Sequence, residues 1–268
     1  MVTLTPSETL GAVPTLTVTG GTITTAGAAA GSDYVYTFTP SDADEAMTVV
    51  VAVGGAADSA GNTNTAASNN FGWTHDATVP TVTSIAVTGV TSGQYGTAAT
   101  YQVIVTGSET LEDAPTLVLQ GGSITTAGAG SSSDAVWTYT FTPTDNDEAV
   151  TIDIAAGGIT DAAGNDNTAA ATQFAFTHDR TAPTISTVAV AGATEDGYGV
   201  ASTYVVTLTP SETLSAVPTL TVTGGTITTA GAASSSNYVY TVTPSSADEA
   251  MTVVVAVGGA ADSAGNTN

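Results

Sequence analysis

The sequence predicts an all-β fold in which antiparallel β-sandwiches follow one another along the chain. Short segments alternate between apolar and polar residues with a period of two, and they are rich in Val, Ile, Thr and Tyr. Clusters of Gly, Pro, Asn and Asp separate these segments, as turns do between strands. No stretch shows the 3.6-residue period of an amphipathic helix, so strands are expected throughout.

An internal repeat divides the chain. Residues 3–14 recur as residues 207–218 with one change, and a more divergent copy ends at Pro115. The repeat unit is about 102 residues, the size of one two-sheet sandwich. The expected domains are residues 1–79, 80–182 and 183–268. The first is expected to lack its first strand and the third its last strand, as in a segment of a longer protein.

The first and third copies are almost the same sequence. Residues 1–64 and 205–268 differ at only seven positions, which are 1, 11, 30, 31, 33, 38 and 42 in the first copy. The middle copy diverges more. The middle copy is therefore the best guide to the strands of a complete domain.

The middle copy predicts seven strands in order: residues 81–87, 100–106, 115–119, 123–126, 135–142, 149–155 and 168–176. Gly93 and Gly96 mark the turn before the second strand, and Gly121 and Gly122 mark the turn before the fourth. Residues 128–133 are expected to form a flexible loop of small residues. An acidic corner at residues 143–148 precedes the sixth strand, and the turn DAAGN at residues 161–165 precedes the seventh.

The fifth strand is expected to carry the core. Trp137, Tyr139 and Phe141 alternate toward one face, and the other copies repeat the pattern with Tyr34, Tyr36 and Phe38, and with Tyr238, Tyr240 and Val242. Seven short antiparallel strands per copy favour tandem immunoglobulin-like seven-stranded antiparallel β-sandwiches. The chain contains no cysteine, so no disulfide can support the cores.

The charge balance excludes several classes of partner. The chain has 24 acidic residues and one basic residue, Arg180. A basic phosphate-binding face is impossible, so nucleic acid is excluded as a partner. Anionic membrane surfaces are disfavoured, and no apolar run has the length of a membrane helix. Most of the acids have no basic partner, so they are expected either to be solvated or to be neutralised by metal cations.

The junction between copies resembles that of a known family. The turn DAAGN at residues 161–165, a strand, and then the pattern D-x-T-x-P-T-I at residues 179–185 are similar to the bacterial Ig-like repeats of giant surface adhesins and extracellular matrix proteins. The resemblance covers the whole chain. It implies a bacterial protein outside the cell or on its surface, in which domains form long stalks, often with calcium at the junctions. The complete absence of lysine departs from the family pattern.

The acids of each junction are candidate calcium ligands. The first junction offers Asp76, Glu109 and Asp161, with Asp42 and Asp44 at the nearby corner. The second offers Asp179, Glu212 and Asp262, with Asp145 and Asp147 at the corner. Calcium takes about six to eight oxygen ligands, which such loops can supply. The alternative is that these Asp residues only shape turns, and the corner residues could form a separate site or none.

Other candidate sites have weaker support. His75 and His178 precede the junction aspartates and could bind metal or sense pH, but a partly exposed residue at a strand end is the favoured interpretation. Thr-rich segments at residues 15–25 and 219–229 suit solvent-facing strands better than an ice-binding surface. No arrangement of Ser, His and Asp suggests a nucleophile, and Glu112 and Asp113 lie in a small loop. The protein is therefore not expected to be an enzyme.

These observations predict a structural function. The expected role is a segment of an extracellular surface protein, a calcium-stiffened stalk or filament that presents or links adhesive parts. Its partners would be neighbouring repeats of the same protein. The alternative is a subunit of a self-assembling fibre, sheath or surface layer, whose partners would be identical chains. A carbohydrate-binding module is less favoured, because the aromatic residues alternate with Thr along strands and are expected to face the core.

Overall fold

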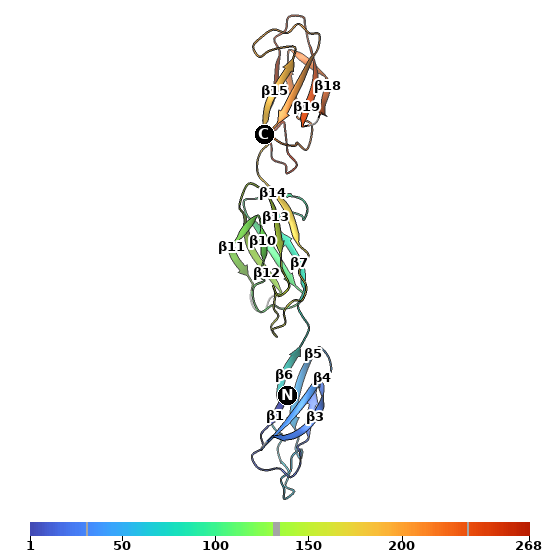
Figure 1. Cartoon of the computed structure of the whole chain (residues 1–268), viewed down its shortest axis with the longest axis vertical. Coiled ribbons are helices and arrows are strands. Elements are labelled where there is room, and N and C mark those ends of the chain that lie inside the picture. The colour runs from blue at the N-terminus through green and yellow to red at the C-terminus, as the bar shows by residue number, and fades with distance from the viewer. Residues whose placement is uncertain (31, 131–134, 235) are drawn as a thin grey trace. The chain divides into compact units, whose positions relative to one another are not determined.

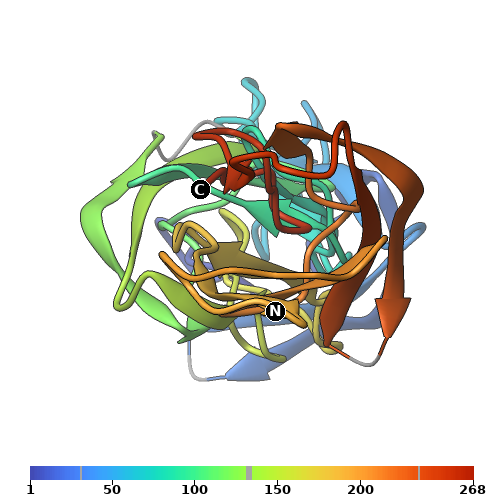
Figure 2. The same ribbon diagram turned by 90° about the horizontal axis from the view of Figure 1, so that it is seen from above.

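The computed structural model describes residues 1–30, 32–130, 135–234 and 236–268. These residues form β-strands and turns and contain no helix, so the predicted all-β class is confirmed (Figures 1 and 2). The described part of the chain accordingly offers no helix that could span a membrane. Of the loop predicted at residues 128–133, residues 131–133 lie outside the described residues, and Gly128 belongs to a strand.

The chain divides into two compact units, and the three domains expected from the repeat stay a prediction. Unit 1 comprises Met1–Pro80 and Thr160–Thr168, and unit 2 comprises Thr81–Ile159 and Ala169–Asn268. The turn of the middle copy thus belongs to the same unit as the first copy. Each unit is described by itself below.

Unit 1 contains two three-stranded antiparallel sheets. Its strands are β1 (Val2–Leu4), β2 (Leu16–Thr19), β3 (Gly21–Ala30), β4 (Asp33–Pro40), β5 (Asp44–Val51) and β6 (Phe71–Asp76). The strand orders are β1-β4-β3 and β2-β5-β6. The side chains of Leu16, Tyr36, Val49 and Val51 form a buried cluster between strands of the two sheets, which is the core that the alternating pattern predicts.

The middle copy supplies two four-stranded sheets to unit 2. Its strands are β7 (Val82–Val87), β8 (Tyr95–Gly96), β9 (Tyr101–Gly107), β10 (Val118–Gln120), β11 (Gly122–Ala129), β12 (Val136–Pro143), β13 (Asp147–Asp153) and β14 (Phe174–Asp179). The orders are β11-β12-β9-β7 and β10-β13-β14-β8. Residues from both sheets share one core, in which Val103, Phe141 and Ile152 are fully buried. This arrangement is sandwich-like.

The third copy forms the rest of unit 2. Its strands are β15 (Ile185–Ala191), β16 (Tyr204–Pro210), β17 (Leu220–Thr223), β18 (Gly225–Ser234), β19 (Asn237–Pro244) and β20 (Thr252–Val255). They make a four-stranded sheet, β15-β16-β19-β18, and a two-stranded sheet, β17-β20. A second hydrophobic cluster lies here around Val206, Leu208 and Val242.

The predicted bounds of the seventh strand of the middle copy are wrong. The strand is not residues 168–176 but β14, which begins at Phe174 and continues through His178 to Asp179. The reason is the partner strand. β13 begins at Asp147, which pairs with Asp179, so the ladder extends to the acidic corner. In addition, the turn predicted around Gly93 and Gly96 contains the short strand β8, which runs parallel to β14.

The aromatic stripe of β12 is buried as predicted, and it also makes a hydrogen bond that the sequence did not reveal. The Tyr139 hydroxyl donates to the carbonyl oxygen of Pro115 at 2.7 Å. The equivalent bonds join Tyr36 to Pro14 at 2.6 Å and Tyr240 to Pro218 at 2.5 Å. A buried hydroxyl needs such a partner. Each copy therefore ties its central aromatic to a proline that lies two or three residues before a strand of the other sheet, β2, β10 or β17.

Candidate metal centre

The turn DxAGN holds its own aspartate carboxylate in place. In unit 1 one carboxylate oxygen of Asp161 accepts the backbone N–H groups of Ala163 and Asn165 at 2.8 and 2.9 Å. Its other oxygen accepts the side-chain amide of Asn165 at 2.9 Å. Gly164 has a φ of 91°, which favours glycine at this position. The same turn recurs at Asp58 and at Asp262.

In unit 2 this turn packs against the end of β14. Asp262 accepts the backbone N–H of Asn266 at 2.9 Å and its side-chain amide at 2.8 Å. The same amide of Asn266 also donates to the carbonyl oxygen of Asp179 at 3.1 Å and to its carboxylate at 3.2 Å. Asp262 is therefore only 2% exposed, although its turn lies in a surface loop. These bonds fix the position of Asp262 relative to Asp179.

Three carboxylates meet at this point. One carboxylate oxygen from each of Asp179, Glu212 and Asp262 lies within 4.8 Å of the other two. Asp179 ends β14, and Asp262 belongs to the turn described above. Glu212 follows β16 in a loop that is held by Ser211, whose N–H donates to the Thr184 carbonyl at 2.8 Å. Residues far apart in the sequence thus supply one compact group of oxygen ligands.

The group carries an electrostatic cost. Burial raises the pKa of Asp179 above its ordinary value, and the negative charge of Asp262 raises it further. Burial also raises the pKa of Glu212, followed by the charges of Asp262 and Asp179. Both carboxyl groups therefore resist ionisation in the folded protein. A bound cation would remove this cost, because it would replace repulsion with attraction.

Unit 1 contains two of the three acids predicted at the first junction, Asp76 and Asp161. Carboxylate oxygens of Asp76 and Asp161 lie within 4.8 Å of one another, and Asp161 is buried. The amide of Asn165 donates to the carbonyl oxygens of Asp76 at 3.3 Å and Thr78 at 3.4 Å. Glu109, the third acid predicted here, belongs to unit 2. Acidic clusters that could hold metal ions thus occur at two places in the chain.

The corner residues Asp44 and Asp147 bind threonine. Asp147 pairs with Asp179 in the β13–β14 ladder, and its carboxylate accepts the hydroxyl of Thr181 at 2.5 Å. Asp44 accepts the hydroxyl of Thr78 at 2.7 Å in the same way. These hydroxyl bonds are the main reason that the pKa values of both carboxyl groups are lowered. Both acids thus brace the segment that follows the last strand of a copy.

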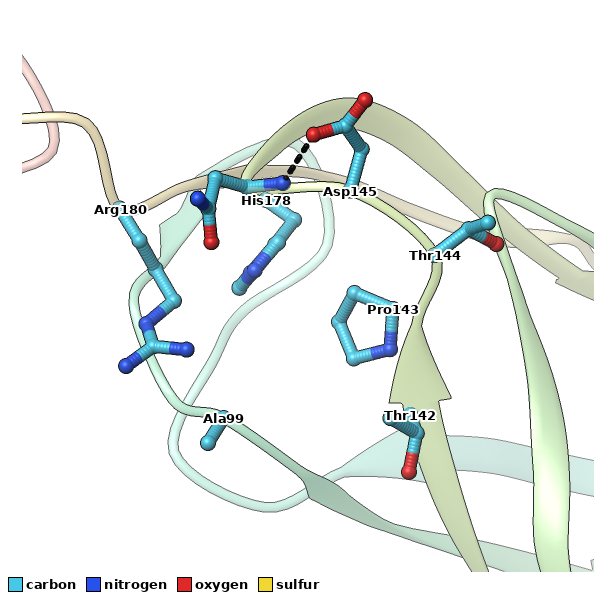
Figure 3. Close-up of a pocket in the computed structure, with 8 residues that line it drawn as sticks. Ala99, Thr142, Pro143, Thr144, Asp145, His178 and Arg180 are labelled. Carbon is cyan, nitrogen blue, oxygen red and sulfur yellow. Dashed lines mark hydrogen bonds between the residues drawn. The ribbon is translucent and has the colours of Figure 1, made fainter.

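Asp42 and Asp145 have a different role at the same corner. One carboxylate oxygen of Asp42 accepts the N–H of Ala43 at 2.8 Å. Asp145 accepts the N–H of Asn146 at 2.7 Å, and Figure 3 shows this bond at the rim of a cavity. Both acids are exposed. Their geometry favours the turn-shaping alternative.

His178 is buried rather than partly exposed, which corrects the sequence-based interpretation. Its Nδ1 atom lies 2.8 Å from the Tyr101 hydroxyl and 3.1 Å from the Gly96 carbonyl oxygen. The ring also lines a cavity of about 260 Å³ together with Asp145 and Arg180 (Figure 3). These contacts tie β14 to β8 and β9, so His178 has a structural role within the middle copy. His75, its counterpart in unit 1, is half-buried.

The sequence-based prediction did not include two sets of residues that hold the acids in place. Asn165 and Asn266 follow the turn aspartates by four residues, and Thr78 and Thr181 follow the strand-end aspartates by two. Their recurrence in each copy was the available signal. No protein-family model, curated protein or solved structure matches this chain. Its function is therefore inferred from residues and geometry.

Proposed function

We propose that this chain is a structural segment of an extracellular surface protein, built from tandem immunoglobulin-like sandwiches. Calcium at the junctions would stiffen the segment into a stalk or filament that presents or links adhesive parts. The observation that carries this proposal is the group of three carboxylates, Asp179, Glu212 and Asp262, within 4.8 Å of one another. The bacterial Ig-like repeats that the sequence resembles support it.

The ligand chemistry favours calcium. The group offers carboxylate oxygens without a histidine or cysteine ligand, and hard cations such as calcium prefer oxygen. Calcium accepts a flexible geometry of about six to eight oxygens, so backbone carbonyls and water would complete the shell. Magnesium demands a stricter octahedron and gives up its water reluctantly, which makes it the weaker candidate.

Such an ion would restrict the hinge between two copies. Only a few residues separate the end of β14 at Asp179 from the start of β15 at Ile185. Within that segment the backbone N–H of Arg180 donates to the carbonyl oxygen of Asn146 at 2.9 Å. Pro183 limits the residue before it to extended conformations. Ligands from β14 and from two loops of the next copy would then share one ion. The ion would hold these segments at one angle.

The alternatives are less well supported. A carbohydrate-binding surface would need exposed aromatic side chains in a row, but Trp137, Tyr139 and Phe141 are buried. An enzymatic role has no support in the residues around the acids. A fibre, sheath or surface-layer subunit shares the same architecture, and it differs from a stalk in that copies of the chain would bind one another.

Calcium titration calorimetry on the full chain tests the proposal. We expect saturable binding with a Kd in the range of extracellular calcium modules, about 10⁻⁴ to 10⁻³ M. Asp262→Ala should remove one site, and Glu212→Gln should weaken it. Asp58→Ala is the matched control, because it loses the same turn bonds but belongs to no group of three acids among the described residues. Absence of saturable binding, or equal loss in the Asp58 and Asp262 variants, would contradict the proposal.

A further inference from the structure

The chain offers one peptide bond to a protease that cuts after basic residues. Such enzymes hold the positive side chain in an acidic pocket, and the chain has no lysine and a single arginine, Arg180. Arg180 is the first residue after β14, and its exposed side chain lines the cavity of Figure 3. The next residue is threonine and not proline, so the bond between Arg180 and Thr181 has the chemistry that these proteases require.

The matching position of the first junction holds no basic residue. Ala77 follows β6 as Arg180 follows β14. The backbone N–H of Ala77 donates to the Ala43 carbonyl oxygen at 3.0 Å. The backbone N–H of Arg180 donates to the Asn146 carbonyl oxygen at 2.9 Å in the same way. The two backbones are thus held alike, and the basic side chain distinguishes the second junction from the first.

Hydrogen bonds hold the Arg180–Thr181 bond in place in the folded chain. The N–H of Thr181 donates to carboxylate oxygens of Asp147 and Asp179 at 3.2 Å each. The Thr181 hydroxyl donates to the other oxygen of Asp147 at 2.5 Å. A protease binds its substrate as an extended strand through main-chain hydrogen bonds, so these contacts must break first. Cleavage therefore requires local opening of the segment at the end of β14.

The same opening would dismantle the group of three acids. Asp179 directly precedes Arg180, and one of its carboxylate oxygens lies within 4.8 Å of those of Glu212 and Asp262. Its carbonyl oxygen and its carboxylate also accept the side-chain amide of Asn266. A protease that draws the residues on both sides of the bond into its cleft would pull Asp179 away from these partners. Opening of the segment and calcium binding would therefore exclude each other.

We propose that the Arg180–Thr181 bond is a cleavage site for an arginine-directed protease, and that calcium at the second junction protects it. This protection rests on the calcium function proposed above. The protease nucleophile adds to the Arg180 carbonyl carbon, the C–N bond breaks, and Thr181 leaves as an amine that takes up a proton. Water then releases Arg180 as a carboxylate, so one water is consumed and nothing is oxidised or reduced. The cut would separate the third copy from the first two.

Binding linkage predicts how strongly calcium should protect the bond. When opening is fast relative to cleavage, the cleavage rate follows the population of the open segment. A ligand that binds only the closed segment lowers this population by a factor of one plus the ratio of free ligand to Kd. Calcium at about one hundred times its Kd should therefore slow the cut about one hundredfold.

Trypsin digestion of the full chain, in calcium and in chelator, tests the proposal. Mass spectrometry would quantify the fragments 1–180 and 181–268. A synthetic peptide of residues 174–187, digested in each buffer, corrects for any effect of calcium on trypsin itself. We expect cleavage in chelator and, after this correction, cleavage about one hundredfold slower in calcium.

Variants locate the source of the protection. Asp262→Ala should be cut in calcium nearly as fast as in chelator, because it removes a calcium ligand. Glu212→Gln should lose part of the protection, and it leaves the turn at Asp262 intact. Asp58→Ala should keep full protection, because it loses the same turn bonds in the first copy. Equal protection in all three variants would overturn the proposal.

The outcomes separate this proposal from the calcium function on which it rests. Equal corrected rates in calcium and chelator, with calcium binding measured by calorimetry, would overturn the protection and leave the calcium function standing. Equal rates without calcium binding would overturn both. An intact chain in chelator after the peptide is fully digested would show that the segment does not open, and would also overturn the proposal.

Discussion

The turns at residues 58–62 and 262–266 have the same sequence, DSAGN, but different neighbours. Asp58 accepts the N–H of Asn62 at 2.8 Å and its amide at 2.7 Å, and Asp262 makes the same two bonds with Asn266. Asp58 is half-buried, whereas Asp262 is buried against the end of β14. The local sequence therefore builds the turn, and the neighbouring acids decide whether it can also bind a metal.

The electrostatics separate the two turns further. The hydrogen bond from the Asn62 side chain is the main reason that the pKa of Asp58 is lowered, so the ionised form of this carboxyl group is stabilised. Asp262 instead raises the pKa values of Asp179 and Glu212, in addition to the effect of their burial. The Asp58 carboxylate is stabilised by its own turn, whereas the Asp262 carboxylate belongs to a group of mutually repelling acids that a cation would stabilise.

The largest expected effect extends this comparison to the cores. Phe141 and Phe38 occupy the same position in two copies, but Phe141 is 0% exposed and Phe38 is half-buried. Phe141→Ala should lower the free energy of unfolding of its copy by about 3–5 kcal/mol. Phe38→Ala should cost clearly less, as measured by urea unfolding. Equal costs would show that the surroundings of the two residues do not differ as described.

The next effect concerns calcium and the two identical turns. Calcium at about one hundred times its Kd should stabilise the folded protein by about 2.7 kcal/mol, seen as a rise in Tm. Asp262→Ala should abolish the part of this rise that comes from the second junction, because the variant removes a ligand. Asp58→Ala should retain it. A full calcium-dependent rise in Tm in the Asp262 variant would contradict the proposed difference between the two turns.

A smaller effect should be the same in all three copies. Tyr139→Phe removes the hydrogen bond to Pro115 while keeping the ring, and should cost about 0.5–1.5 kcal/mol. Tyr36→Phe and Tyr240→Phe should have similar costs, because each loses the matching bond. Urea unfolding of the three variants measures this. A negligible cost in every copy would show that the bond contributes no net stability.

The same tyrosine predicts a dependence of stability on alkaline pH. Burial raises the pKa of Tyr139 from its ordinary value of 10.0 to about 12. The folded protein therefore keeps this proton when the unfolded chain has lost it. The resulting stability is present below about pH 10 and is lost as pH rises toward 12. The Tm of the Tyr139→Phe variant should fall less steeply than that of the unchanged protein over this pH range. An identical fall in Tm would exclude Tyr139 as the source of the pH dependence.

Much of this structure could be predicted from the sequence, because alternation and repetition report local preferences. The all-β class, the buried stripe around Trp137 and the grouping of Asp179 with Glu212 and Asp262 follow from such signals. The end of β14 could not be predicted, because the length of a ladder depends on where the partner strand begins. Burial of His178 was missed for a related reason, since its partners lie in β8 and β9.

The corner acids show a second limit. Asp145 and Asp147 are two residues apart and equally acidic, so the sequence predicts the same role for both. The structure gives them different roles, because Asp147 lies in the ladder opposite Asp179 and Asp145 lies in the turn. Only tertiary pairing distinguishes them.

Small-angle scattering of the full chain, with calcium and then with chelator, tests the central claim most directly. If calcium stiffens the junctions, the distribution of chain dimensions should be narrow in calcium and broader in chelator. Asp179→Ala should broaden the distribution in calcium, whereas Asp145→Ala should not. Identical curves in both conditions, together with an unchanged Tm, would contradict the account and leave a flexible string of β-domains without a calcium-dependent shape.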